Sequence, residues 1–136
     1  MAAIKEITFS SSKQFELINI TRAVEEFIQA SQISEGICCL FVPHATAGLI
    51  VNEDEPGVKK DILKSILALA PEKESYLHNK IDNNARAHVM ASIIGPDLNF
   101  PINNSQLLRG IWQEIFFVEL DGPRPSRKVI LKIIEG

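Results

Sequence analysis

Three histidines are the residues of this 136-residue chain best suited to metal or acid–base chemistry. They are His44, His78 and His88, and each lies in a polar, non-repetitive stretch. Neutral imidazole is the commonest metal ligand in proteins, and three imidazoles around one open position form a catalytic zinc site. Their spacing is not that of a zinc finger or of a His-Glu-x-x-His helix, so a shared centre requires the fold to bring them together. The alternative is three separate surface or hydrogen-bonded histidines.

Polar residues near the histidines are candidates for catalysis or ligand binding. Glu53 follows a short predicted strand, and Asp61 lies early in the next predicted helix; either could act as a general base or orient a ligating histidine. The alternative is the preference of acidic residues for helix N-termini, which explains the residues just after Glu53 better than Glu53 itself. Asn84 and His88 are four residues apart and share one face of a predicted helix. Asn84 is therefore either a ligand-binding residue or the cap of that helix.

Two late motifs carry further candidate binding residues. Gln113 lies in an apolar run, where a buried amide needs a partner, whereas its neighbour Trp112 is predicted to belong to the core. The turn at 121–125 is followed by Arg127 and contains Arg124, and a pair of guanidinium groups can bind phosphate in a bidentate manner. The alternative is a solvated hairpin tip.

Composition predicts one globular domain that spans residues 1–136. The chain is 46% hydrophobic, with a net charge of −3 and a pI of about 5.6, which argues against binding to nucleic acid or to anionic membranes. We expect no transmembrane helix and no signal peptide. Cys38 and Cys39 are adjacent and would point to opposite faces of a strand, so a disulfide between them is not expected. These features favour a cytoplasmic protein.

Hydrophobic periodicity predicts an α+β fold with about eight strands and two or three helices. One helix contains Val24, Phe27 and Ile28 and begins at Asn19 or Thr21. The apolar run at 36–42 is predicted to be a strand buried on both faces. The other predicted strands cover 4–9, 14–18, 47–51, 98–102, 107–120 and 128–134, and the other helices cover 58–69 and 84–94.

Several motifs follow one another in the order found in a known family. They are His44-Ala45-Thr46-Ala47-Gly48-Leu49-Ile50-Val51-Asn52-Glu53, Tyr76-Leu77-His78-Asn79, Asn84-Ala85-Arg86-Ala87-His88, Gly110-Ile111-Trp112-Gln113 and Asp121-Gly122-Pro123-Arg124. Together they resemble the YjbQ-like family, which is named for a secondary thiamine-phosphate synthase activity, over nearly the whole chain. The family's usual Gly-Thr-Trp-Gln has Ile111 in place of Thr, and its usual Asp-Gly turn is Asn104-Ser105 here.

The resemblance implies a two-sheet β-sandwich-like α+β domain that assembles as a homotrimer. It also implies a divalent metal, most often zinc, in a pocket close to a subunit interface. Position by position it assigns the metal to His44, His78 and His88, catalytic roles to Glu53 and Asp61, and substrate binding to Asn84, Gln113 and Arg124, to which we add Arg127. Magnesium is the alternative cation, although it prefers oxygen ligands.

The expected function is that of a metal-binding enzyme of this kind that acts on a small phosphorylated molecule. The side activity implied by the resemblance couples hydroxymethylpyrimidine diphosphate to thiazole phosphate and releases pyrophosphate. Three imidazoles suit zinc better than magnesium, so this reaction and this ligand set match poorly. Two alternatives remain: a metal-dependent hydrolase, and a non-enzymatic trimeric protein that binds a metal or a small ligand.

Overall fold

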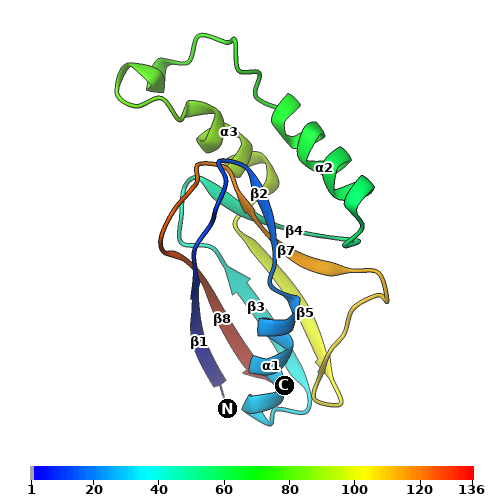
Figure 1. Ribbon diagram of the computed structural model, residues 1–136. Coiled ribbons are helices and arrows are strands. Elements are labelled where there is room, and N and C mark those ends of the chain that lie inside the picture. Colours follow the sequence, from blue (N-terminus) through cyan, green and yellow to red (C-terminus); the bar gives the residue numbers. More distant parts are fainter. Residues whose placement is uncertain (1) are drawn as a thin grey trace.

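The computed structural model describes residues 2–136 and contains two antiparallel sheets with three α-helices (Figure 1). The strands are β1 Ala2–Phe9, β2 Glu16–Asn19, β3 Gly36–Phe41, β4 Ala47–Asn52, β5 Asp97–Asn103, β6 Gln106–Leu107, β7 Glu114–Glu119 and β8 Arg127–Glu135. The α-helices are α1 Thr21–Ser31, α2 Pro56–Ala68 and α3 Ala85–Ile94, and η1 Leu77–Lys80 is a short 3₁₀ helix. The α+β prediction is confirmed.

The two sheets differ in size and in the order of their strands. The larger sheet runs β1-β8-β3-β5-β6 and the smaller β2-β7-β4. All neighbours are antiparallel, and β8 pairs with both β1 and β3, with Phe9 opposite Arg127 and Phe41 opposite Ile130. Apart from the hairpin of β5 and β6, neighbouring strands are thus far apart in the sequence, and their antiparallel pairing excludes a doubly wound parallel sheet.

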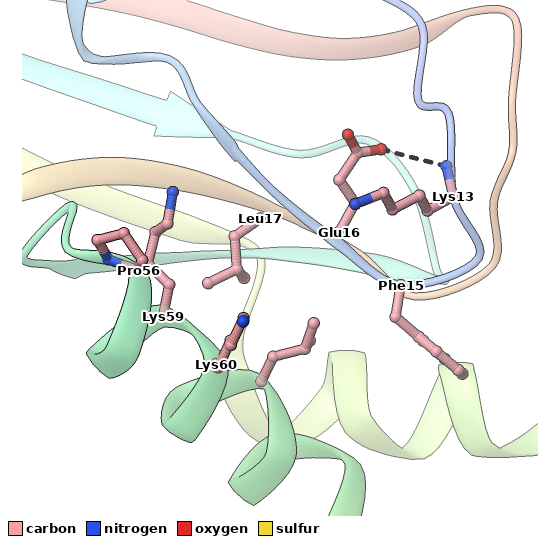
Figure 2. Close-up of a pocket in the computed structure, with 8 residues that line it drawn as sticks. Lys13, Phe15, Glu16, Leu17, Pro56, Lys59 and Lys60 are labelled. Atoms are coloured by element: carbon pink, nitrogen blue, oxygen red, sulfur yellow. Dashed lines mark hydrogen bonds between the residues drawn. The ribbon is translucent and has the colours of Figure 1, made fainter.

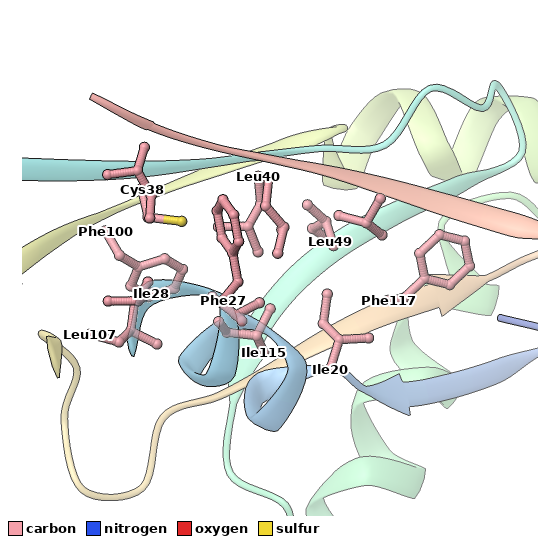
Figure 3. Packing of buried hydrophobic residues seen from close by; sticks show 14 of the residues in the cluster. Ile20, Phe27, Ile28, Cys38, Leu40, Leu49, Phe100, Leu107, Ile115 and Phe117 are labelled. Carbon is pink, nitrogen blue, oxygen red and sulfur yellow. The ribbon is translucent and has the colours of Figure 1, made fainter. Parts of the chain in front are cut away.

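The main core lies between the larger sheet, helix α1 and one face of the smaller sheet (Figure 3). Phe27 and Ile28 of α1 fall at helical spacing and meet Leu40 of β3 and Phe117 of β7 in this cluster. The amide N–H of Thr21 donates to Oδ1 of Asn19 over 2.9 Å at the start of α1. The spacing of Val24, Phe27 and Ile28 in the sequence thus predicts both helix α1 and the face that it buries.

A second core lies on the opposite face of the smaller sheet. Val118 of β7 packs there with Ile66 of α2 and Met90 of α3. Because neighbouring residues of a strand point to opposite faces, β7 sends Phe117 into the first core and Val118 into the second. Helix α3 consequently covers the sheet on the side where two of the histidines lie.

The helix boundaries follow from local signals in the sequence. Pro56 occupies the first turn of α2, and the side chain of Glu55 accepts a hydrogen bond from the amide of Val58 over 2.9 Å. Helix α3 ends at Gly95, whose φ of 90° is a conformation that glycine adopts without strain. The predicted helices over 58–69 and 84–94 are confirmed within a few residues.

Three sequence-based predictions about burial and extent are wrong. Strand β3 is buried on one face only, because Ile37 and Phe41 are exposed on the outer face of the larger sheet. The predicted strand over 107–120 is regular only in β7, since a turn occupies the residues before Glu114. Trp112 lies in that turn and is 68% exposed, so it is not a core residue.

The two cysteines are both free, as their adjacent positions in β3 predict. Cys38 points into the main core and is fully buried, whereas Cys39 is half-buried. Burial, together with a smaller effect of the neighbouring Cys39, raises the pKa of the Cys38 thiol to about 12. At neutral pH this thiol therefore stays protonated, and a thiol is a much weaker nucleophile than a thiolate. No helix in the described part of the chain is long and apolar enough to cross a membrane.

Candidate functional site

The three histidines singled out by the sequence lie near helix α3, which covers the smaller sheet, but they do not form one cluster. His78 lies in η1 and His88 in α3, and their rings meet edge to face with centroids 4.6 Å apart. His44 lies in the loop between β3 and β4 and lines a pocket of about 220 Å³ together with His88. His88 is therefore the residue that links the other two.

His44 is held by the backbone of a neighbouring strand. The amide N–H of Lys128 in β8 donates to Nε2 of His44 over 2.9 Å, so this nitrogen carries the lone pair. Burial lowers the pKa of His44, and the guanidinium of Arg127 lowers it further. His44 is thus a neutral imidazole at neutral pH, with its proton on Nδ1.

A chain of polar contacts orients His78. Nε2 of His78 lies 3.0 Å from Oδ1 of Asn84, the residue just before α3. The amide of Asn84 donates to Oδ2 of Asp121 over 2.8 Å, and Nη2 of Arg124 donates to the same Oδ2 over 2.7 Å. The alternative role of Asn84 as a side-chain cap is not realised, because Asn79 accepts the hydrogen bond from the first helical amide, that of Ala85.

Arg124 and Arg127 lie in different environments, although the first lies in the turn at 121–125 and the second follows it closely. The side chain of Arg124 is 45% exposed and keeps part of its guanidinium in solvent. Arg127 is 3% exposed, and its Nε donates over 2.8 Å to Glu119, which is completely buried. Burial raises the pKa of Glu119, but hydrogen bonds from Arg127, from the amide of Asp121 and from Ser11 outweigh it and hold the pKa below its ordinary value. This ion pair is internal and leaves Arg127 no open face for phosphate.

The remaining predicted site residues lie outside the histidine pocket. Glu53 is half-buried after β4 and Asp61 is exposed on α2; neither is among the residues that line the pocket. Gln113 closes the turn before β7, because its Oε1 accepts a hydrogen bond from the amide of Gly110 over 2.7 Å. Direct contacts therefore connect His78 with His88 and Asn84, and Asp121 extends this chain to Arg124. His44 is connected to the chain only through the pocket that it shares with His88. Glu53, Asp61 and Gln113 belong to neither.

The donor set fits a divalent metal in part. Residues 2–136 contain no group of three or more His, Cys, Asp or Glu side chains arranged to hold a metal ion. The His78–His88 pair nevertheless supplies two adjacent imidazoles, and a hydrogen-bonded amide behind one ring is the usual support of a ligating histidine. His44 could ligate through Nε2 only by giving up the hydrogen bond from Lys128.

A different pocket, of about 350 Å³, lies between β2 and α2 (Figure 2). Lys13, Lys59 and Lys60 line it together with apolar residues that include Phe15 and Leu63. Nζ of Lys59 is 2.7 Å from the carboxylate of Asp54, whereas no ion pair of Lys13 or Lys60 is found among residues 2–136. Glu16 also lines this pocket, so its three lysines outnumber one carboxylate; it contains no histidine.

Sequence reasoning missed the two carboxylates that organise the site, Asp121 and Glu119. A lone glutamate in the apolar run that ends at Leu120 signals a buried partner, since an unpaired buried charge is costly. Arg127 is eight residues further on and is that partner. Asp121 gave no such signal, because an Asp-Gly pair is also the usual composition of a turn.

The chain is similar to proteins of a single family across nearly its whole length. The model of the family described as "UPF0047 protein YjbQ-like" matches residues 5–136. A UPF0047 protein of Archaeoglobus fulgidus is 37% identical over 129 residues, which cover 95% of this chain and 99% of that relative. The UPF0047 protein YugU of Bacillus subtilis is 38% identical over 132 residues, which cover 96% of this chain and 98% of YugU.

Crystal structures of similar proteins share the fold. A YbjQ-like protein of unknown function from Sulfolobus solfataricus P2 superimposes with a TM-score of 0.97 at 42% identity, covering 100% of this chain and 99% of that one. A hypothetical protein from Aeropyrum pernix K1 gives a TM-score of 0.93 at 34% identity, covering 98% of this chain and 99% of that one.

Proposed function

Because the chain belongs to the YjbQ-like UPF0047 family, we propose that it is a metal-dependent enzyme acting on a small phosphorylated molecule. The observation that carries this proposal is the contact between His78 and His88, whose ring centroids are 4.6 Å apart. Two adjacent imidazoles, one of them hydrogen-bonded to an amide, would supply two of the nitrogen ligands of a divalent cation. Zinc is the preferred cation and magnesium the alternative.

His78 and His88 would hold the metal, which when bound supplies a positive charge for the oxygens of the substrate. His44 is the third candidate ligand, provided that its Nε2 exchanges the amide of Lys128 for the metal. If that bond persists, His44 instead offers the proton of Nδ1 to a substrate oxygen in the same pocket.

Arg124 is the phosphate-binding residue of the proposal. Its guanidinium is partly exposed, and Asp121 connects it through Asn84 to His78. A partly exposed guanidinium can donate two parallel hydrogen bonds to a phosphate. We exclude Arg127 from this role, because Glu119 already occupies its buried guanidinium.

Metal content measured by elemental analysis on tag-free, zinc-loaded protein tests the proposal. We expect about one zinc per chain in the wild type, and its loss in His78→Ala and in His88→Ala. Lys80→Ala is the matched control, because Lys80 lies exposed in the same 3₁₀ helix as His78 and should keep the metal. Retention of zinc in His44→Ala would make His44 a proton donor rather than a ligand. Full zinc occupancy in both His78→Ala and His88→Ala would refute the proposal.

The reaction itself separates two classes of enzyme. Coupling of hydroxymethylpyrimidine diphosphate to thiazole phosphate would identify the thiamine-phosphate synthase-like transferase. Zinc-dependent release of product from phosphate esters, amides or lactones would identify a hydrolase, since a bound metal lowers the pKa of water to about 7. The absence of turnover with all of these, in protein that contains the metal, would count against an enzyme.

We also propose that the chain assembles as a homotrimer and that the turn before β7 contributes to the contact between subunits. Ile111 and Trp112 are 83% and 68% exposed, and apolar side chains so exposed are typical of interaction sites. A neighbouring subunit could then bring Gln113, Glu53 or Asp61 to the histidines. Light scattering should give three chains per particle, and Trp112→Ser should lower that number.

A second candidate function, the non-catalytic binding of a small anion, is favoured by the lysine-lined pocket between β2 and α2. Lys13 and Lys60 would bind the anionic group, and Phe15 and Leu63 would contact an apolar part of the same ligand. Titration with inorganic pyrophosphate separates the two sites. Loss of binding in a Lys13→Ala/Lys60→Ala variant, but not in Arg124→Ala, would favour this second function.

A further inference from the structure

We infer that Asp121 is a positioning residue that fixes the proton of His78 on Nε2 and leaves Nδ1 as the atom that binds. This inference rests on the proposed function only for what Nδ1 binds. The position of the proton follows from two hydrogen bonds that connect the turn after β7, through Asn84, to η1.

The first step is the orientation of the Asn84 amide. Its Nδ2 lies 2.8 Å from Oδ2 of Asp121, and a carboxylate can only accept hydrogen bonds when ionised. A reversed amide would place Oδ1 against that carboxylate, where two acceptors repel each other. The charge of Asp121 therefore holds Nδ2 on its own side and turns Oδ1 toward His78.

The second step is the tautomer of His78. Its Nε2 lies 3.0 Å from Oδ1 of Asn84, and an amide oxygen only accepts hydrogen bonds. Nε2 must therefore be the donor and carry the proton. In the neutral ring the remaining nitrogen, Nδ1, then has the only lone pair available to a metal or to a donor on the substrate.

The third step is the anchoring of Asp121 itself. Nη2 of Arg124 donates to Oδ2 over 2.7 Å, and Nε of Arg124 donates to the backbone carbonyl of Asp121 over 2.9 Å. The amide of Asp121 donates to Oε1 of the buried Glu119 over 3.0 Å. The carboxylate is thus fixed by its own backbone and by a neighbouring cation, so it can orient Asn84 without contacting the histidines.

The direct test is the tautomer of His78 in the metal-free protein, read by long-range proton–nitrogen NMR on histidine labelled with ¹⁵N. In mildly alkaline solution, where imidazole is neutral, we expect the Nε2–H form to exceed the Nδ1–H form by about tenfold or more, as befits an amide held by a charge-assisted hydrogen bond. Asp121→Ala should reduce this excess to within about threefold, since only neutral contacts then orient the amide.

Two variants separate positioning from a general structural effect. Asp82→Asn is the matched control: Asp82 lies close to η1 and accepts a hydrogen bond from the amide of Asn83, but it does not contact the side chain of Asn84. Arg124→Ala removes one of the anchors of the Asp121 carboxylate, so it should lower the excess of the Nε2–H form to a value between those of the wild type and Asp121→Ala. Asp82→Asn should keep the tautomer ratio of the wild type, and both variants should retain the dispersed amide spectrum of a folded protein.

The outcomes distinguish this inference from the proposed function. An Nδ1–H form as the main tautomer in the wild type would overturn the inference, whether or not Asp121→Ala folds. An unchanged ratio in folded Asp121→Ala would overturn the role of Asp121. If instead the tautomer behaves as expected and the wild type binds no zinc, the metal-dependent function fails while the role of Asp121 stands. With both correct, Asp121→Ala should weaken zinc binding about 10- to 100-fold.

Discussion

Two arginines that flank one turn, Arg124 and Arg127, each pair with a carboxylate, yet their pairs serve different purposes. Arg127 and Glu119 are almost completely buried, and Ser11 and Thr46 supply further hydrogen bonds. The pair of Arg124 with Asp121 lies at the surface, where solvent competes for every contact. Burial, rather than the residue types, decides which of the two arginines remains available to a ligand.

The largest expected effect is the loss of stability when one partner of the buried pair is removed. Arg127→Ala leaves the charge of Glu119 unpaired in the core, which should lower the free energy of unfolding by about 3–5 kcal/mol. Chemical denaturation followed by fluorescence or circular dichroism measures this change. A Glu119→Leu/Arg127→Met double variant should recover most of the loss, because it removes both charges. A loss below about 1 kcal/mol in Arg127→Ala, as for an exposed pair, would show that this pair does not differ from the surface pair.

Protonation of Glu119 in acid should lower the free energy of unfolding, by less than the Arg127→Ala substitution does. Because the pKa of Glu119 is lower in the folded than in the unfolded chain, the unfolded state binds a proton first as the pH falls. The stabilisation is complete above the ordinary glutamate pKa of about 4.3 and is lost as the pH falls through the lower, folded-state value. Denaturation curves between neutral and acidic pH should show this slope, and Glu119→Gln should reduce it. An unchanged slope in the variant would place the acid sensitivity elsewhere.

The smallest expected effect on stability is that of Arg124→Ala. Its pair with Asp121 is exposed, so the free energy of unfolding should change by no more than about 1 kcal/mol. The same variant should weaken the binding of a phosphorylated ligand, because a partly exposed guanidinium is removed from the proposed site. Isothermal titration with inorganic pyrophosphate, alongside the unfolding curve, measures both properties. If Arg124→Ala instead lost much stability and no binding, Arg124 would have a structural role and would not be the arginine available to a ligand.

Periodicity and turn residues predicted most of the fold. Val24, Phe27 and Ile28 identify the buried face of α1, and Gly95 marks the end of α3. The pattern could not reveal that β3 is exposed on its outer face, because an apolar run reads the same whether one or both faces are covered. For that reason the run at 36–42 is predicted to be buried on both faces, although Ile37 within it lies on the surface.

The candidate site was less predictable, since its contacts join residues far apart in the sequence. Residue type alone pointed to His78 and His88, but their contact depends on how η1 folds back onto α3. The hydrogen bond between Asn84 and Asp121 spans 37 residues and has no local signature. The same limitation applies to Arg127, which sequence reasoning assigns to phosphate binding: a lone Glu119 in an apolar run predicts a buried cation, but it does not identify Arg127 as that cation.

The position of β8 between β1 and β3 has a consequence for how the chain folds. Residues 2–9 pair only with β8 among the described strands. During synthesis they therefore cannot join the larger sheet until residues 127–135 have been made. Such long-range pairing is slow, because the entropy of a long loop is lost before the contacts form. The amide of Lys128, which donates a hydrogen bond to His44, belongs to the same strand, β8. That hydrogen bond needs β8 in its place, so the histidine pocket is complete only in molecules whose larger sheet has closed around β8.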